Sequence, residues 1–506
     1  MSSILAPLYK WTERNPDTLL FAFLDGEGGT TESYTYSQFQ QRTTDIASHI
    51  QQTFPMQPGE RVLLAYPPGV EMICAFFACV RSGLIPVPVY PPTSHGFQAA
   101  RAKTEFIARD CQAIAVLTDR SYYWSMKLNQ TRNSVATLSF RRAYLSTLRW
   151  IVTTDADKGA RAHLAEAHSD VLFLQYTSGS TSEPKGVMVT HDCVLENCEA
   201  VVDHLPVGVS WLPQYHDMGL IGYYIFFALK GGTTYGFSPV DFIQRPALWL
   251  ETISKYRGTA SSAPNFAYEY CLRPDKLPAA ALEGLDLSSL RFLMTAAEPV
   301  RAGVCRDFIR RFEPYGLNPR SFFSAYGLAE YTLAVSNYGR TIKDFDRAAL
   351  RGHQIQPANA DTQAADITTL VSCGRALGTT EVRIVEVTGA PREAGDREVG
   401  EIWIRGGSKC RGYWKRPELS ASVFEARLPG EPEGSAGWLR SGDLGFLFDN
   451  ELYVCGRLKD MLIVRGLNYY PQDIEALVEE DPRVRKGCVA AFACEGDGCE
   501  TLVVVA

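Results

Sequence analysis

The sequence predicts an α/β protein with a large N-terminal body of mostly parallel sheets flanked by helices, a β-rich lobe, and an incomplete small α+β C-terminal domain. Its 506 residues exceed the roughly 250 to 300 at which a single core stops growing, so more than one lobe is expected. The 46% hydrophobic and 21% charged content is that of an ordinary globular protein. Disordered and fibrous classes are thereby excluded.

The body is predicted from a repeated alternation of strands and helices. After a short surface helix within Met1 to Asp17, a strand at Arg61–Tyr66, an apolar helix at Glu71–Arg81 and a strand at Ile85–Tyr90 form a βαβ unit. Further strands are expected at Ala113–Leu117, Trp150–Thr153, Val171–Tyr176, Gly232–Phe237 and Leu290–Thr295. Alternating strands and helices are typical of parallel sheets.

The pattern changes near Val382, where short strands follow one another with Gly, Pro and Asp turns. These strands are expected at Val382–Val385, Glu401–Ile404, Gly445–Phe448 and Glu451–Val454. A polar stretch at about 338–365 is interpreted as an inserted loop. The predicted domains are therefore 1–456, which contains the insertion and the β-rich lobe at about 382–456, and 457–506, the hinge and the truncated start of a C-terminal domain.

Composition also limits the partners. The net charge of -7 offers no surface for a polyanion, so nucleic acid is not an expected partner. The longest apolar stretch, Gly219–Leu229, is shorter than the roughly 18 to 20 residues that cross a bilayer. The 13 cysteines include no C-x-x-C pair and indicate reduced thiols in the cytoplasm, and the 8 histidines show no zinc-ligand spacing. We expect a cytoplasmic monomer.

The most informative segment is a Ser/Thr-rich loop between Tyr176 and Gly186, directly after a predicted buried strand. Two glycines allow close backbone approach, five hydroxyls supply donors, and Lys185 supplies a cation for polyphosphate. The loop is not a Walker motif, because Lys185 precedes Gly186 and Val187 rather than Ser or Thr. The loop therefore predicts a phosphate site of another kind.

This loop resembles the signature of the acyl-adenylate-forming superfamily, which groups acyl-CoA synthetases, adenylation domains of peptide synthetases and luciferases. Other segments match the family's motifs in order: Ala296-Ala297-Glu298-Pro299, Ser324-Ala325-Tyr326-Gly327-Leu328-Ala329-Glu330, Arg411-Gly412-Tyr413-Trp414, Ser441-Gly442-Asp443-Leu444-Gly445 and Gly456-Arg457-Leu458-Lys459-Asp460. The resemblance covers essentially the whole chain.

Within the superfamily the chain is most similar to the fatty acyl-AMP ligases that load polyketide and lipopeptide assembly lines. Four features carry this narrower resemblance: Phe21–Gly26, Tyr215–Gly222, the polar insertion and Asn468–Glu475. It implies that ATP and Mg²⁺ activate a medium- or long-chain fatty acid as acyl-AMP. The acyl group then passes to the phosphopantetheine thiol of an acyl carrier protein, which could be fused in the parent chain.

The resemblance also implies roles for individual residues. Lys185 and Glu330 would be catalytic, with Glu330 as the Mg²⁺ ligand, Asp443 and Arg457 would bind ribose and α-phosphate, and Tyr326 would stack on adenine. The wider ATP-binding set is Thr177, Ser178, Gly179, Ser180, Thr181, Ala296, Ala297, Glu298, Ser324, Ala325, Tyr326, Gly327, Asp443 and Arg457.

The acyl side and the hinge are assigned in the same way. His216 would gate or orient the carboxylate, which needs no general base because it is already ionised at neutral pH. Lys459 stands where the family places its hinge. The acyl pocket is expected at Asp217, Met218, Gly219 and Ile221.

Other interpretations stay open. An acyl-CoA synthetase shares the first half-reaction, and an amino-acid adenylation domain is supported by Asp217 alone, because an acid near this position binds the substrate amine in such relatives. A catalytically silent binding relative is disfavoured by the intact set of Lys185, Glu330, Asp443 and Arg457. The family's late C-terminal lysine has no candidate before Ala506, so we expect either a shortened expression product or a fragment of a larger synthase.

Overall fold

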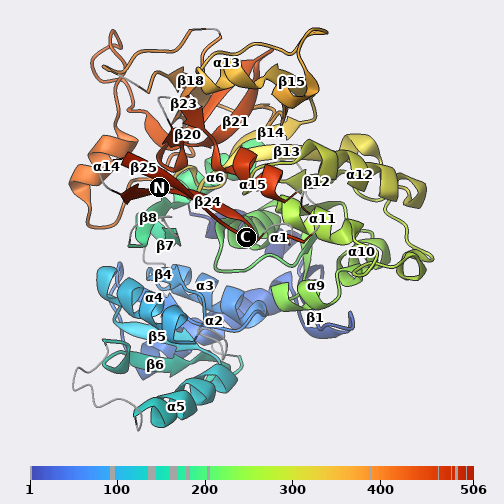
Figure 1. Cartoon of the computed structure of the whole chain (residues 1–506). Coiled ribbons are helices and arrows are strands. Elements are labelled where there is room, and N and C mark those ends of the chain that lie inside the picture. The colour runs from blue at the N-terminus through green and yellow to red at the C-terminus, as the bar shows by residue number, and fades with distance from the viewer. Residues whose placement is uncertain are drawn as a thin grey trace. The chain divides into compact units, whose positions relative to one another are not determined.

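The computed structural model describes residues 3–91, 97–134, 144–159, 169–177, 183–201, 206–387, 389–395, 397–464, 467–479, 481, 483–484, 488–496 and 499–506. The chain divides into two compact units, each described here by itself. Unit 1 is Met1–Ala260 with Cys410–Ser420, and unit 2 is Ser261–Lys409 with Ala421–Ala506. Figure 1 shows the α/β architecture, with parallel sheets and an additional β lobe, that the sequence predicts.

Unit 1 contains most of the predicted strand and helix alternation. Its helices are α1 (Leu5–Arg14), α2 (Tyr36–Thr53), α3 (Val70–Arg81), α4 (Phe97–Asp110), α5 (Arg120–Ser134), α6 (His191–Val201), α7 (Asp217–Gly219), α8 (Phe226–Lys230), α9 (Pro239–Gln244) and α10 (Ala247–Lys255). Its strands are β1 (Leu19–Leu24), β2 (Thr30–Thr35), β3 (Arg61–Leu64), β4 (Ile85–Pro88), β5 (Ala115–Thr118), β6 (Arg149–Val152), β7 (Val171–Thr177), β8 (Lys185–Thr190), β9 (Val207–Ser210) and β10 (Thr233–Gly236). β11 (Ala260–Ala263) begins at its end.

The predicted βαβ unit is confirmed as β3, α3 and β4. The sheet runs β4-β3-β5-β6 with every pair parallel. α3 is apolar all around, and ten of its residues are buried, from Val70 to Val80 with only Glu71 less enclosed. A helix that is hydrophobic on every face lies inside the fold rather than at its surface. In a second sheet of unit 1, β1 and β9 lie on either side of β10, parallel to it, and β2 is antiparallel to β1.

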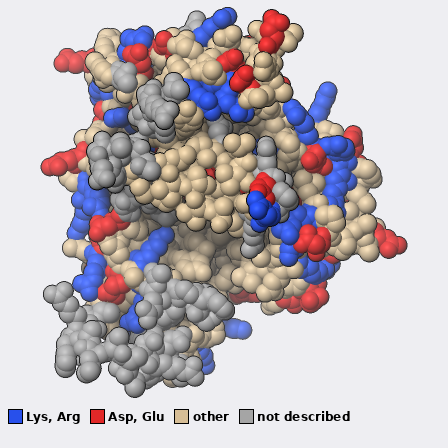
Figure 2. All heavy atoms as spheres, in the orientation of Figure 1, with Lys and Arg blue, Asp and Glu red and all other residues tan. Residues whose placement is uncertain are grey.

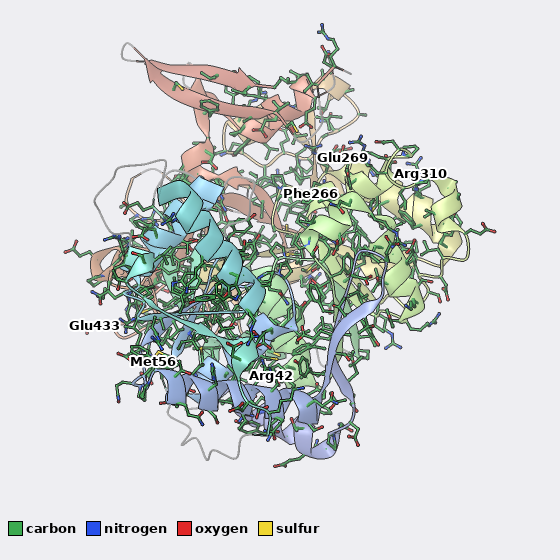
Figure 3. All side chains as sticks on the ribbon, turned by 90° about the horizontal axis from the view of Figure 1, so that it is seen from below. Arg42, Met56, Phe266, Glu269, Arg310 and Glu433 are labelled. Carbon is green, nitrogen blue, oxygen red and sulfur yellow. The ribbon has the colours of Figure 1, made fainter. Side chains whose placement is uncertain are left out.

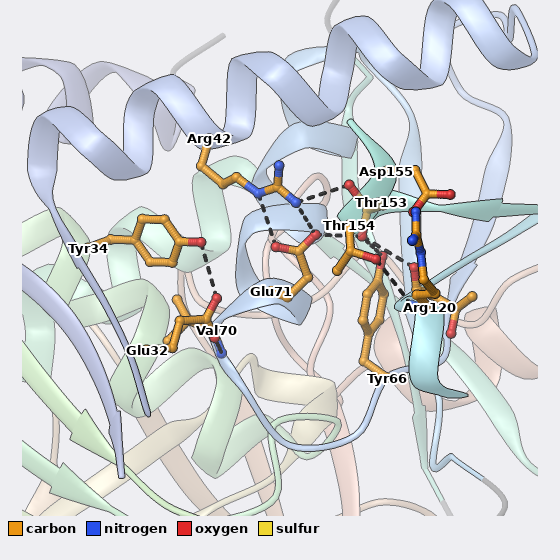
Figure 4. A network of polar contacts seen from close by, with 11 residues as sticks. Glu32, Tyr34, Arg42, Tyr66, Val70, Glu71, Arg120, Thr153, Thr154 and Asp155 are labelled. Carbon is orange, nitrogen blue, oxygen red and sulfur yellow. Dashed lines mark hydrogen bonds and ion pairs between the residues drawn. The ribbon is translucent and has the colours of Figure 1, made fainter. Parts of the chain in front are cut away.

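The one acidic residue of α3 is held by a basic residue of α2, as Figure 4 shows. The Arg42 guanidinium donates to both oxygens of Glu71, Nη2 to Oε1 at 2.6 Å and Nε to Oε2 at 3.1 Å. Thr153 donates its hydroxyl to the same carboxylate at 2.7 Å and accepts or donates a bond with the Tyr66 hydroxyl. The bidentate pair satisfies a largely buried charge and joins the two helices.

A cavity of about 590 Å³ lies beside this network. It is lined by Glu32, Tyr66, Pro67, Pro68, Gly69, Glu71, Asp119, Arg120, Ser121 and Thr154. Its charged groups already have partners: Glu32 accepts from the Val70 amide, and Arg120 pairs with Asp155 (Figure 4). No residue assigned to ATP or acyl binding is among its lining residues, so we do not assign the chemistry to it.

The strand before the phosphate loop is not part of a parallel sheet, in contrast to the expectation for Val171–Tyr176. β7 pairs antiparallel with β8 as a two-stranded hairpin. Periodicity could identify the strand but not its partner, because a fully apolar run is compatible with either pairing. The two strands bring together Thr177 and Lys185, which flank the Ser/Thr-rich loop in the sequence.

Unit 2 carries the remaining elements. Its helices are α11 (Asn265–Leu272), α12 (Ala302–Phe312), α13 (Arg347–Arg351) and α15 (Pro471–Val478), and α14 (Pro417–Phe424) enters it from unit 1. Its strands are β12 (Phe292–Thr295), β13 (Phe322–Gly327), β14 (Ala334–Gly339), β15 (Ile342–Asp346), β16 (Ile367–Val371), β17 (Arg375–Ala376), β18 (Glu381–Val385), β19 (Gly400–Arg405), β20 (Leu439–Phe448), β21 (Glu451–Arg457), β22 (Leu462–Val464), β23 (Leu467–Tyr469), β24 (Ala490–Gly496) and β25 (Cys499–Val505).

The β-rich lobe predicted after Val382 is confirmed. β18, β19, β20 and β21 form an antiparallel meander in that order. β12 and β13 are parallel neighbours, and β14 and β17 continue from β13 in antiparallel pairing. The carboxyl ends of β12 and β13 lead into two of the family-like motifs, which is the edge where parallel sheets place their ligands.

The polar insertion is more ordered than an inserted loop. It contains β15 and α13, and β15 pairs antiparallel with β16. Phe345 and Ile355 are 0% and 2% exposed and pack in one core cluster with Leu444 and Phe446 of β20. A few apolar residues are enough to anchor this polar segment, because they all pack against the β lobe.

The C-terminal elements of unit 2 begin after β21. A turn at Leu458–Asp460 leads to the β22 and β23 hairpin, α15, and the β24 and β25 hairpin. The division of the chain at Gly456 stays a prediction, because residues on both sides belong to unit 2.

No helix among the described residues is long and apolar enough to span a membrane. On the face seen in Figure 2, Lys and Arg are interspersed with Asp and Glu rather than gathered into a field of one sign. Such a mixed surface is ordinary for a globular protein.

Candidate active site

The base of the predicted phosphate loop is formed by β7 and β8. Thr177 and Lys185 are register partners at the open end of the hairpin, and Tyr176 pairs with Gly186. Gly186 is required here, since a Cβ would come within 2.9 Å of the Tyr176 ring. Ser178, Gly179, Ser180 and Thr181 lie outside the described residues. The hairpin thus places the two described ends of the loop side by side.

A segment distant in sequence supports this hairpin. The Lys185 Nζ lies 5.3 Å from the centroid of the Tyr413 ring, a distance at which a cation is attracted to the ring face. The Met188 amide donates to the Gly412 carbonyl at 2.8 Å, and the Trp414 amide donates to the Gly186 carbonyl at 2.8 Å. Tyr413 was not among the predicted site residues, although its motif was recognised; the motif's place in the chain order was the available signal.

Gln175 is a second residue that the sequence analysis did not identify. It is 4% exposed, and its Nε2 donates to the Tyr215 carbonyl at 3.0 Å. This bond joins the strand before the phosphate loop to the segment that carries His216. A lone amide in an otherwise apolar buried strand was the signal, because buried polar groups are generally there to make such bonds.

Asp443 has the surroundings of a ligand-binding carboxylate. The Tyr326 hydroxyl donates to its Oδ2 at 2.6 Å, and the Arg457 Nε lies 3.5 Å from its Oδ1. Burial raises the pKa of Asp443, while the Tyr326 hydroxyl and the Arg457 charge act in the opposite direction. Asp443 and Arg457 are register partners on β20 and β21, so the sheet itself brings them together. The structure therefore joins three of the predicted nucleotide residues.

The motif after β12 forms a tight loop. Ala296 is buried, and Ala297 adopts a φ of 71°, a region that costs a residue with a Cβ of the order of 1 to 2 kcal/mol. The Glu298 carboxylate accepts a hydrogen bond from the Phe266 amide. Burial is the main cause that raises the pKa of Glu298. A strained backbone at a predicted ligand site is consistent with a constrained binding loop.

The residues of the motif on β13 differ in how far they are buried. Ser324 is 1% exposed and donates its hydroxyl to the Ser372 carbonyl, and Ala325 and Tyr326 are also buried. Gly327 is required, because a Cβ would lie 1.8 Å from the Leu333 carbonyl oxygen. Glu330 follows in a short 3₁₀ turn and is partly exposed. Its carboxylate is a hard oxygen donor of the kind that Mg²⁺ takes.

His216 and Asp217 form a close pair. Their Nδ1 and Oδ1 atoms are 2.6 Å apart, and the Asp217 carboxylate also accepts from the Met218 amide. The charge of Asp217 is the first cause that raises the pKa of His216, and burial acts against it. The imidazole is 56% exposed, whereas the Asp217 side chain is 13% exposed. Asp217 is thus already engaged by its neighbours.

The predicted acyl segment is buried and irregular. α7 (Asp217–Gly219) continues into a π-helical turn at Leu220–Ile225 and then α8. Met218, Gly219 and Ile221 are all buried. Gly219 is required by close approach, because a Cβ would lie 2.2 Å from the Pro213 carbonyl oxygen. Single π turns within helices are frequent at functional sites.

The predicted residues thus fall into two described groups. Lys185, His216 and the acyl segment belong to unit 1, whereas Glu298, Tyr326, Glu330, Asp443, Arg457 and Lys459 belong to unit 2. Lys459 is exposed within the turn at Leu458–Asp460, and its role as a hinge stays a prediction. No group of three or more metal-ligating side chains occurs in the part of the chain that the structure describes.

The described parts of the predicted ATP site are the β7–β8 hairpin of unit 1 and the Asp443 cluster of unit 2. The family model for AMP-binding enzymes matches residues 8–414. The chain belongs to this family of AMP-binding enzymes.

Curated relatives are similar over nearly the whole chain. JamA, a medium-chain-fatty-acid–[acyl-carrier-protein] ligase of Moorena producens, is 38% identical over 500 residues, which cover 96% of this chain and 82% of that protein. A long-chain-fatty-acid–AMP ligase of Mycobacterium marinum is 35% identical over 531 residues, covering 99% of this chain and 86% of that protein.

Solved structures agree with the fold. A structure from a study of fatty acyl-adenylate ligases of E. coli and L. pneumophila has a TM-score of 0.86 at 30% identity and covers 100% of this chain and 87% of that one. The fatty acyl-adenylate ligase of L. pneumophila, in complex with acyl adenylate and pyrophosphate, has a TM-score of 0.78 at 33% identity, with 99% and 85% covered.

Proposed function

We propose that this chain is a fatty acyl-AMP ligase that activates a medium- or long-chain fatty acid with ATP for transfer to an acyl carrier protein. The observation that carries the nucleotide half of the proposal is the largely enclosed Asp443, whose side chain is 14% exposed, held by Tyr326 and next to Arg457. A carboxylate with two oxygens suits the two ribose hydroxyls. The names of the relatives support the fatty-acid half.

The reaction needs charge to be masked rather than a base. The fatty acid is already ionised, and its carboxylate oxygen attacks the α-phosphorus of ATP; the new P–O bond forms as the bond to pyrophosphate breaks. Lys185, next to the phosphate loop, offsets negative charge, and Arg457 donates toward the α-phosphate. Glu330 would hold Mg²⁺, which supplies charge neutralisation between phosphate groups.

The choice of acid rests on the state of Asp217. A carboxylate that is to bind a substrate amine should be open to it, but here Asp217 faces His216 at 2.6 Å and accepts the Met218 amide. The following residues, Met218 to Leu229, are almost entirely buried and apolar, as an alkyl chain requires. These contacts support a fatty acid over an amino acid.

The acceptor is proposed from the insertion. Its Phe345, Leu350 and Ile355 share a core cluster with the β lobe and with Tyr470, the residue before α15. The Arg351 guanidinium lies 4.5 Å from the centroid of the Tyr469 ring. Because the insertion contacts both the β lobe and the C-terminal elements, we infer that it restricts the movement of the C-terminal elements. Restricted movement supports an acceptor other than free coenzyme A.

The test is ATP–pyrophosphate exchange with a series of fatty acids and amino acids, followed by trapping of the adenylate with hydroxylamine. Exchange that depends on fatty acids of medium or long chain is the expected result. Exchange that depends on amino acids alone would refute the choice of acid. Size-exclusion chromatography and fractionation of cells test the monomeric state and the cytoplasmic location that we propose with this activity.

A further inference from the structure

Arg301 joins three elements around the loop that follows β12. It is the N-cap residue of α12, three positions after Glu298. Its Nη1 lies 3.2 Å from Glu269 Oε2 on α11, and its Nη2 lies 3.0 Å from Glu479 Oε2 at the end of α15. One guanidinium therefore bridges two carboxylates from different helices, a geometry that its planar fork allows.

The backbone of the same segment is tied to α11 at two points. The Arg301 amide donates to Asn265 Oδ1 at 3.1 Å, and the Phe266 amide donates to the Glu298 carboxylate. Figure 3 shows Phe266 and Glu269 on α11, with Arg310 on α12. Since Asn265 is 3% exposed, the first of these bonds is protected from water. The loop from Ala296 to Arg301 is thus tied to α11 at two points that follow its strained residue, Ala297.

Because the backbone at Ala297 is strained, these contacts are needed to hold its conformation. A non-glycine residue at a φ of 71° keeps that conformation only where its surroundings determine it. Arg301 supplies both an amide contact and a charge contact to the helix that faces the loop. Without the charge contact, fewer interactions hold the backbone of the loop in its left-handed conformation.

Glu479 extends the connection to the C-terminal elements. Its side chain is 5% exposed, and it lies at the C-terminal end of α15, where the helix dipole is unfavourable for an acid. A buried carboxylate in that position needs a cation. α15 is in turn joined to β24, because the Ala491 amide donates to Glu475 Oε1 at 3.0 Å.

We infer that Arg301 is a positioning residue for the adenine side of the ATP site, and that Glu479 makes this positioning depend on the placement of α15. The inference rests on the proposed function and on the family resemblance, which implies that Ala296, Ala297 and Glu298 of the ATP-binding set border the adenine. Arg301 acts through the loop rather than on the reacting atoms, so its effect falls on recognition of the base.

The experiment measures ATP–pyrophosphate exchange for Arg301→Gln, Arg301→Lys and Glu479→Gln, with Arg310→Gln as control. Arg310 lies on the same helix but is exposed and pairs locally with Asp307. Arg301→Gln is expected to raise the KM for ATP about tenfold and to leave the KM for the fatty acid within about twofold. Arg301→Lys should recover part of the affinity, and Arg310→Gln should resemble the wild type.

Two further readouts separate positioning from a general loss of structure. The preference for ATP over GTP should narrow in Arg301→Gln, since only the base differs between them. Arg301→Gln with Glu479→Gln should be no worse than Arg301→Gln alone, because both remove the same contact. An unchanged KM for ATP, an equal rise of both KM values, or an unchanged nucleotide preference would each overturn the inference. A wild type with no exchange at all would instead refute the proposed function.

Discussion

At the scale of single residues, three charged side chains of the predicted site each have a close neighbour. Tyr326 donates to Asp443, Asp217 meets His216, and Lys185 lies against the Tyr413 ring. Motifs in the sequence predicted the first two pairs as members of a site. They could not predict the third, because a cation and a ring 228 positions apart (413 minus 185) meet only through the fold.

Lys185 and Glu330 give the most direct test of the proposed chemistry. Alanine at either position should lower kcat/KM for adenylation. The loss of transition-state stabilisation should be roughly 2 to 4 kcal/mol, by analogy with the deletion of a hydrogen-bond donor to the transition state. Lys343→Ala is the control for Lys185, since Lys343 is a lysine paired with Asp449 on the surface. Adenylation that survives Glu330→Ala at saturating Mg²⁺ would move the metal to another ligand.

Asp443 should show a conflict between binding and stability. Its pKa is raised above the ordinary value of 3.8, mainly by burial, so the ionised form is disfavoured in the fold. Its contribution to stability is therefore present below pH 3.8 and lost as the pH rises through the raised pKa. Asp443→Asn, which stays neutral, is expected to raise the free energy of unfolding at pH 7 relative to the wild type.

The same substitution should raise the KM for ATP about ten- to a hundredfold, the value of a hydrogen bond to a charged group. Denaturant unfolding of both proteins between pH 3 and pH 8 gives the stability difference, which should shrink toward the acid end. A variant that is less stable than the wild type at pH 7 would contradict the assigned effect of burial.

At the scale of elements, the strands and helices of the body were predictable, and their pairing was less so. β3, α3 and β4 follow the expected βαβ unit, because apolar runs of strand length flank a helix of continuous apolar residues. β7 was predicted as a strand, but its antiparallel pairing with β8 was not, since the polar sequence between the two strands does not indicate their relative direction. The sequence did not predict β15 and α13 within the insertion. They form despite the polar composition of the segment, because three apolar residues pack into the core of the lobe.

The close approach at Gly219 predicts sensitivity of the acyl segment. Gly219→Ala should disrupt the turn that carries His216, because its Cβ would lie 2.2 Å from the Pro213 oxygen. Gly303→Ala is the matched control: it lies in α12 with nothing within 4 Å of an added Cβ. That control should instead gain roughly 0.5 to 1 kcal/mol from helix propensity. Thermal unfolding and fatty-acid KM values distinguish the two outcomes.

The contact of α13 with Tyr469 predicts how the acceptor is chosen. Arg351→Ala removes the cation from the ring and should increase acyl-CoA formation without changing adenylation, because it loosens the insertion but leaves its core intact. Arg347→Ala, which removes contacts from the insertion to Thr368 and Ile367 of β16, is the control. Release of acyl-CoA should be assayed by chromatography. Robust acyl-CoA formation by the wild type, at the level of both variants, would argue for the synthetase alternative.

At the scale of the whole molecule, composition and alternation were enough to predict a multi-lobed α/β protein, and ordered motifs were enough to suggest its family. Composition and motif order did not predict which residues belong to each of the two compact units. Residues 410–420 belong with unit 1, although the chain on either side of them belongs to unit 2. Nothing in the local sequence marks such a return, since it is set by pairing of Val187 with Tyr413 across the fold.

That return determines how the protein can be dissected. An expression fragment that stops at Ala260 would end at the first residue of β11 and would omit the Gly412 and Trp414 bonds to β8. We expect such a fragment to be recovered poorly as folded material, and co-expression of a peptide spanning residues 410–420 to improve its yield by fragment complementation. Hydrogen exchange of the Met188 amide would report the repair, because Gly412 is its acceptor. A boundary chosen from sequence order alone would separate the phosphate-loop hairpin from the piece of chain that completes it.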